Sequence, residues 1–194
     1  MKKITAMICV LTMLTCIFSG CGEVSQAREV VKDYFTALNE LDFPAAGECL
    51  GDPQIYISVM TDLDPAGGST LYDRVQATYF VTFVYTNLKW KCLSVKETGD
   101  GFTARVRIDS YSAEEITRAV ARSQQELMEK PEYDKADDER KYLMLINNIP
   151  EIYISLDREL EQYTSTVEIQ IIRYGEDLLI VPSQALFDAI GGVN

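Results

Sequence analysis

Hydrophobic positions near the start of the chain repeat every three or four residues, which is the period of an amphipathic helix. Ser25 is a suitable N-cap for this helix, because a serine hydroxyl accepts a hydrogen bond from a free backbone N–H group. Asp42 and Pro44 predict a second, short helix that ends at Gly51. The apolar face of the first helix consists of Ala27, Val30, Val31, Tyr34, Leu38 and Leu41.

Two pairs of strands are predicted by the alternation of apolar and polar residues. Residues 88–95 and 102–108 alternate in this way, and the glycines and aspartate of 99–101 between them are typical of a hairpin turn. Residues 167–171 and 178–181 form a second pair with the same pattern. Because one face of each strand is apolar, we expect an antiparallel sheet with helices on one side and water on the other.

A long helical segment separates the two strand pairs. Ser112 and Glu115 match a capping box and open a helix that Pro131 ends. The helical insert is expected to cover about residues 112–163, and Ser183 is expected to cap a closing helix. Helices and antiparallel hairpins that follow one another in separate blocks indicate the α+β fold class.

Residues 71–85 carry a mixed signal. Tyr72, Val75 and Tyr79 have helical spacing, whereas Val81 and Val84 are residue types that favour a strand. The length of the segment favours a helix.

Composition places limits on the chemistry of the chain. The 194 residues are 47% hydrophobic and 25% charged, which suits a single domain with its own core. The chain has no histidine, so it lacks the usual general base and the commonest zinc ligand, and we expect no metal and no cofactor. Its 30 acidic and 18 basic residues give a net charge of −12, which argues against nucleic acid as a partner.

The first twenty residues have the pattern of an export signal. Lys2-Lys3 is a short positive region, and residues 4–17 form an apolar run that is too short to span a bilayer core of about 30 Å. Ser19-Gly20 then precede Cys21. This arrangement resembles the lipobox of bacterial lipoprotein precursors, although Phe18 stands where that family usually has leucine.

The lipobox resemblance implies a location and an anchor. Residues 1–20 would be removed as a signal peptide, and Cys21 would become a lipidated N-terminus on the extracytoplasmic face of the cell membrane. Residues 21–24 would form a short tether, followed by one domain over 25–194. The mature chain would hold 16 basic and 30 acidic residues. We therefore expect anionic headgroups to repel it and the lipid alone to hold it at the membrane.

Segments at both ends of the mature chain carry a second resemblance. They are residues 30–38 (VVKDYFTAL), 41–43 (LDF), 45–46 (AA), 167–171 (VEIQI), 178–181 (LLIV) and 185–191 (ALFDAIG). These patterns resemble the NTF2-like lipoproteins over most of residues 25–191. The resemblance implies a curved, mostly antiparallel sheet wrapped on helices to form a cone with an opening. Relatives use such a cone to hold a small molecule, to catalyse a reaction or to dock a partner, so the fold does not choose among them.

Two functions remain open at this stage. The first is a non-enzymatic binding or accessory module of the cell envelope, whose partner is a small hydrophobic ligand or an envelope protein. The alternative, implied by isomerase-like and dehydratase-like relatives, is a cone-pocket enzyme with an Asp base and a Tyr hydroxyl acting on a hydrophobic substrate. No spacing singles out an aspartate, so no catalytic residue is named. The candidate pocket residues are Tyr56, Tyr72, Tyr79 and Tyr153.

Two cysteines remain after the leader and Cys21 are set aside. Cys49 and Cys92 are an even pair in an exported protein, where disulfides are permitted, and they form the candidate disulfide. The alternative is that both are small buried thiols that never meet.

Overall fold

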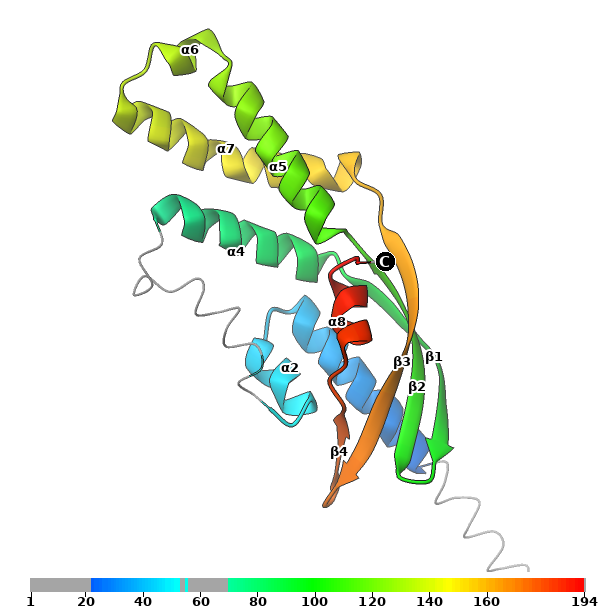
Figure 1. Ribbon diagram of the computed structural model, residues 1–194. Helices are drawn as coiled ribbons and strands as arrows, with labels where there is room; N and C mark the ends of the chain where they lie inside the picture. Colours follow the sequence, from blue (N-terminus) through cyan, green and yellow to red (C-terminus); the bar gives the residue numbers. More distant parts are fainter. Residues whose placement is uncertain (1–21, 53–54, 56–69, 194) are drawn as a thin grey trace, which may run out of the picture.

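The computed structural model describes residues 22–52, 55 and 70–193, which form an α+β fold (Figure 1). Cys21 and Tyr56 therefore lie outside the described residues. The strands are β1 (Lys89–Thr98), β2 (Gly101–Ser110), β3 (Tyr163–Tyr174) and β4 (Asp177–Ile180), and they form one open antiparallel sheet in the order β1-β2-β3-β4. The helices are the first helix (22–39), α2 (Phe43–Cys49), α4 (Leu71–Thr86), α5 (Ala113–Met128), α6 (Pro131–Asp134), α7 (Asp138–Glu159) and α8 (Gln184–Ile190).

The first helix is already formed at residue 22, three residues before the start that the sequence predicts. Residues 22–24, which the sequence assigns to a tether, are already helical, so Ser25 lies inside the helix and is not its N-cap. The reason is tertiary, because Arg173 of β3 donates a hydrogen bond to Glu23 at 2.7 Å and Val24 packs against the core. The extra turn is thus held by the sheet, and this contact was not visible in the local pattern.

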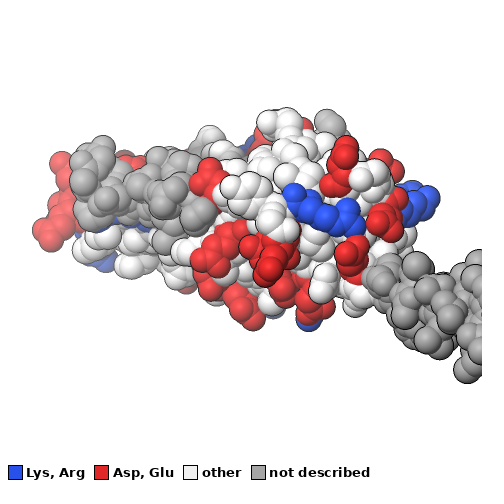
Figure 2. Space-filling model, turned by 90° about the horizontal axis from the view of Figure 1, so that it is seen from below, with Lys and Arg blue, Asp and Glu red and all other residues white. Residues whose placement is uncertain are grey.

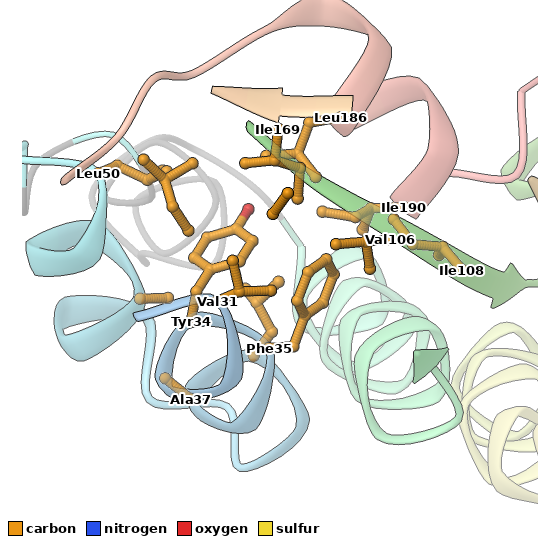
Figure 3. Close-up of a cluster of buried hydrophobic side chains, with 14 of the residues drawn as sticks. Val31, Tyr34, Phe35, Ala37, Leu50, Val106, Ile108, Ile169, Leu186 and Ile190 are labelled. Carbon is orange, nitrogen blue, oxygen red and sulfur yellow. The ribbon is translucent and has the colours of Figure 1, made fainter. Parts of the chain in front are cut away.

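The main core lies between the first helix and the inner face of the sheet. Phe102, Ala104, Val106 and Ile108 of β2 have no solvent exposure, as their alternation predicts. Figure 3 shows Phe35 of the first helix pointing toward Val106 and Ile190, so that helix, sheet and α8 meet in one cluster. Burial of these apolar side chains is the main stabilising contribution of this half of the molecule.

Polar contacts fix the first helix to the edge of the sheet. The Trp90 indole stacks on Phe35, with ring centroids 5.3 Å apart, and its N–H donates to the Asn39 side chain at 3.2 Å. The Asn39 amide in turn donates to the carbonyls of Tyr85 and Leu88, each at 2.8 Å. One side chain therefore bonds two backbone carbonyls of the turn between α4 and β1 and holds that turn against the first helix.

A second core lies among α4, α5 and α7. Residues 71–86 are a helix, as their length predicts, and a capping box between Thr70 and Asp73 starts it. Phe83 on this helix packs against Tyr111 and Tyr153, with ring centroids 5.0 and 5.9 Å away. The insert and α4 therefore share a second hydrophobic core, and their helices lie beyond one end of the sheet (Figure 1).

The start of α5 confirms half of the predicted capping box. The Ser112 hydroxyl accepts a hydrogen bond from the Glu115 backbone N–H, as expected. The Glu115 carboxylate does not return to the cap, however, because it accepts a hydrogen bond from the Tyr163 hydroxyl at 2.6 Å. A tertiary contact has replaced the local one.

The helices all lie on one face or beyond one end of the sheet in Figure 1, which agrees with the one-sided alternation of the strands. The sheet is open, with β1 and β4 as its two edges, so a cone is not confirmed. In the part of the chain that the structure describes, no helix is long and apolar enough to cross a membrane.

Gly101 is the residue of the β1–β2 hairpin that tolerates no side chain. A Cβ built there would lie 2.1 Å from the Ile171 carbonyl oxygen, whereas a Cβ on Gly99 would meet nothing within 4 Å. We predict that Gly101→Ala lowers the free energy of unfolding by about 2–3 kcal/mol, because strand β2 must move away from β3. Gly99→Ala should change it by less than about 0.5 kcal/mol. Urea denaturation of both variants measures the difference, and equal midpoints would contradict the close approach.

Candidate functional site

An apolar pocket lies where the two cores meet. It has a volume of about 230 Å³ and is bounded by α4, the start of α5 and α8. Val84 belongs to the second core and Ile190 to the first, so the pocket is a gap in the packing between them. Its lining includes Phe80, Val84, Tyr85, Ala113, Phe187 and Ile190.

The local sequence explains how each wall of the pocket is held. Phe80 and Val84 are four residues apart and share one face of α4. Ala113 is the first residue of α5, and its N–H donates to the Gly191 carbonyl at 3.1 Å, which joins α5 to the end of α8. The sequence shows the apolar spacing within α4. That spacing does not indicate that α8, about a hundred residues later, forms the opposite wall of the pocket.

The lining of the pocket is mainly apolar. Tyr85 is the one ionisable side chain in its lining, and burial raises the pKa of that phenol, which keeps it neutral. No carboxylate, lysine or cysteine belongs to the lining. A cavity of about 150 Å³ is enough for benzene, so this pocket has room for an aromatic ring or a short alkyl chain.

Three of the four tyrosines proposed from the sequence lie close together, but not in this pocket. Tyr79 and Tyr153 stack between α4 and α7, with ring centroids 5.9 Å apart, and Tyr72 packs against the same core. Burial raises the pKa of Tyr153 strongly, and the nearby Tyr72 adds to the rise. Tyr153 belongs to the second core and Tyr72 packs against it, whereas the Tyr79 ring is 37% exposed and lies over Tyr153.

The structure contains an Asp/Tyr pair of the kind that an enzyme would need. The Tyr111 hydroxyl donates to Asp157 at 2.7 Å. Burial, followed by this hydrogen bond, raises the pKa of Tyr111 to about 12. Neither residue belongs to the apolar pocket, and the bond ties the end of β2 to α7. The pair is therefore placed to brace the insert, and no spacing in the sequence connects its two members.

A polar groove runs beside the Tyr163–Glu115 hydrogen bond. It has a volume of about 360 Å³ and also contains Arg118, Arg122 and Glu159. Because both signs of charge line it, it favours neither an anion nor a cation. Among the described residues, no group of three or more carboxylates, cysteines or histidines is placed to hold a metal ion.

Cys49 and Cys92 are not joined, and each is a half-buried free thiol. Cys49 lies beside Leu178 and Leu179 of β4, whereas Cys92 is on β1, at the opposite edge of the sheet. Three strand spacings of about 4.8 Å separate those edges, which exceeds the Cα separation of about 7 Å that a disulfide spans. Burial raises the pKa of both thiols, to about 11 for Cys49. They fit the alternative of small buried residues.

The Tyr111–Asp157 bond should support stability in a pH-dependent way. We predict that Tyr111→Phe lowers the free energy of unfolding by about 1.5 kcal/mol at neutral pH, because it removes a hydrogen bond to a charged group. A pKa raised on folding favours the protonated phenol in the native state, so this contribution falls as the pH rises from about 10 to about 12.

Thermal melts between pH 8 and 12 measure both effects of Tyr111→Phe. The variant should lose stability less steeply with pH than the parent chain, while the other tyrosines with raised pKa keep part of the slope. Tyr174→Phe is the matched control, because that side chain is 71% exposed. An unchanged slope and midpoint for Tyr111→Phe would show that the bond does not hold the insert.

Comparison with known proteins finds no match among family models, curated proteins or solved structures. The candidate site is therefore defined by this chain's own residues. It consists of the apolar pocket between α4, α5 and α8.

Proposed function

We propose that this protein is a lipid-anchored, extracytoplasmic lipoprotein whose domain is a non-enzymatic binding module. Its ligand is a small apolar group that occupies the pocket between α4, α5 and α8. The observation that carries the binding role is the composition of that pocket, whose lining is apolar apart from the hydroxyl of the half-buried Tyr85. An enzyme would need a polar group aimed at the substrate, and the nearest Asp/Tyr pair is not part of the lining.

The start of the folded domain supports the proposed anchor. The first helix is already formed at residue 22, and Glu23 within it is bonded to Arg173. A removed leader of residues 1–20 would therefore leave the described helix intact. The lipid on Cys21 would join the domain with almost no free tether, which holds the domain at the membrane surface.

We also propose membership of the NTF2-like lipoproteins, on the sequence resemblance. The order of elements supports it, since N-terminal helices pack on a four-stranded antiparallel sheet and a short helix closes the chain. The proposed membership rests on the sequence resemblance and on this order of elements, and it does not include a closed cone. The proposed ligand site is accordingly the gap beside α8 and not the mouth of a cone.

The anchor is tested by Cys21→Ser. We predict that the wild-type chain partitions into the detergent phase of a membrane extract, whereas the variant leaves that phase or keeps its leader, because it lacks the acceptor for the lipid. Fractionation and the mass of the N-terminal peptide measure both outcomes. Cys49→Ser is the matched control and should stay anchored. Unchanged detergent partitioning of Cys21→Ser would contradict the lipoprotein proposal.

The pocket is tested by filling it. We predict that the full chain binds N-phenyl-1-naphthylamine, a neutral apolar fluorophore, and that Ala113→Leu weakens this binding about tenfold, because the added methyl groups occupy the cavity. Titration of the fluorescence gain measures the affinity. Ala121→Leu adds the same atoms at an exposed position of the same helix and should bind like the parent chain.

Two results would count against the pocket. Equal affinities for the parent chain, Ala113→Leu and Ala121→Leu would place the fluorophore elsewhere. No fluorescence gain with the parent chain, under conditions in which its thermal melt shows a folded protein, would mean that the pocket does not accept an apolar group.

A further inference from the structure

The outer face of the sheet carries a concentration of positive charge. On β1, Lys89, Lys91 and Lys96 point away from the core, and on β2 Arg105 and Arg107 do the same, since the residues between them are directed inward. All five are exposed. The acidic residues on the same face are Asp109, Glu168 and, opposite Tyr174 on the edge strand β4, Asp177. A chain with 30 acidic residues therefore presents a face with an excess of cations.

Little of this positive charge is neutralised within the molecule. Asp109 pairs with Arg107 at 3.2 Å, and Glu168 stands opposite Arg105 in the β2–β3 register. Lys91 and Lys96 have no ion pair among the described residues. By contrast, Figure 2 shows many more acidic than basic side chains on the face of the molecule that it presents.

The strand register brings like charges together at a cost to folding. Lys91 stands directly opposite Arg107. Lys96 stands opposite Thr103, two residues along β2 from Arg105 and on the same face. Like charges at facing positions destabilise a sheet. The facing cations therefore do not stabilise the sheet, and an anion bound from outside the chain would offset their repulsion.

Apolar side chains accompany the cations at one end of this face. Ile172 is 42% exposed and Tyr174 is 71% exposed, and both alternate outward on β3. Leu93, the unpaired residue of the bulge midway along β1, is also 42% exposed. Aromatic rings with a polar tip, mixed with lysine and arginine, are typical of surfaces that lie in the headgroup region of a membrane.

The proposed anchor joins the chain at this same end. Glu23 bonds to Arg173, which lies between Ile172 and Tyr174 in the sequence, and Cys21 is two residues before Glu23. Figure 1 shows the first helix starting beside the β1–β2 hairpin, with α6 at the far end of the molecule. A lipid on Cys21 would thus hold the exposed apolar side chains next to the bilayer.

We propose that the outer face of the sheet, from Lys89 to Tyr174, lies on an anionic lipid surface and sets the orientation of the anchored domain. This inference rests on the proposed lipid anchor. Asp100 and Glu176 lie in the turns at the rim of the face, and Asp177 stands opposite Tyr174 at the start of β4, so the cations need the anchor to hold them within reach of the headgroups. The net charge of the chain predicts repulsion, whereas the separation of its charges gives attraction on one side.

Lysine labelling of the full, lipid-anchored chain tests the orientation. The protein is placed in vesicles of phosphatidylcholine, with or without about 30% phosphatidylglycerol, and an amine-acetylating reagent marks its exposed lysines for mass spectrometry. We expect acetylation of Lys91 and Lys96 to slow about threefold or more on the anionic vesicles and to recover in about 0.5 M salt. Lys130 and Lys135, at the α6 end, should react alike on both.

A charge-reversal variant provides the matched comparison. Lys91→Glu, Lys96→Glu and Arg105→Glu together should make the labelling of Lys89 the same on both kinds of vesicle. Lys130→Glu, Lys135→Glu and Arg140→Glu change the net charge equally at the far end and should keep the difference. Thermal melts of both triple variants establish that each is folded.

The outcomes separate this inference from the anchor itself. If the protein leaves the vesicle fraction altogether, the lipid anchor has failed, and with it the proposed function. If the protein stays with the vesicles but Lys91 and Lys96 react equally on both lipids, the orientation is wrong and the anchor stands. Protection of these lysines by added soluble polyphosphate, without protection by anionic vesicles, would overturn the membrane as partner in favour of an anionic polymer.

Discussion

The burial of one sheet face beneath the first helix is the contact on which the rest of the structure depends. Phe102, Ala104, Val106 and Ile108 are completely buried, so every second residue of β2 is committed to the core. Because side chains alternate in a strand, the residues between them must face the other way. The same constraint that builds the core therefore also builds the exposed basic face, and a shift of register by one residue would exchange the two.

The helical insert extends this arrangement with a core of its own. The contact of Phe83 with Tyr111 and Tyr153 holds α4 against the chain that leaves β2, and the Tyr111–Asp157 bond adds α7. The two cores are each well packed but do not merge fully, and the apolar pocket is the space left between them. Cavities at such junctions are common positions for ligands, because neither set of side chains can fill the gap completely.

Charge is the second organising property of the molecule. The net charge of the whole chain is negative, and on that basis alone a bilayer with anionic lipids would repel it. The fold gathers five cations on the outer sheet face, whereas most of the carboxylates lie on helices and turns. An anchored domain of this kind has a preferred side toward an anionic surface, and the helical insert would then extend from the end of the sheet away from the anchor (Figure 1).

The sequence by itself determined the features that depend on local chemistry and periodicity. The α+β class, the one-sided alternation of β2, the Asp42, Ser112 and Ser183 caps and the helix over 71–86 follow from it, because each rests on neighbours within a few residues. Only the tertiary structure decided what distant residues do together. Arg173 bonds to Glu23 in the first turn described, and Glu115 bonds to Tyr163 instead of its own helix cap. Cys49 and Cys92 lie at opposite edges of the sheet, and α8 and α4 together line a pocket. Those contacts join residues from about 40 to 150 positions apart, and no periodicity within a segment carries information over that distance.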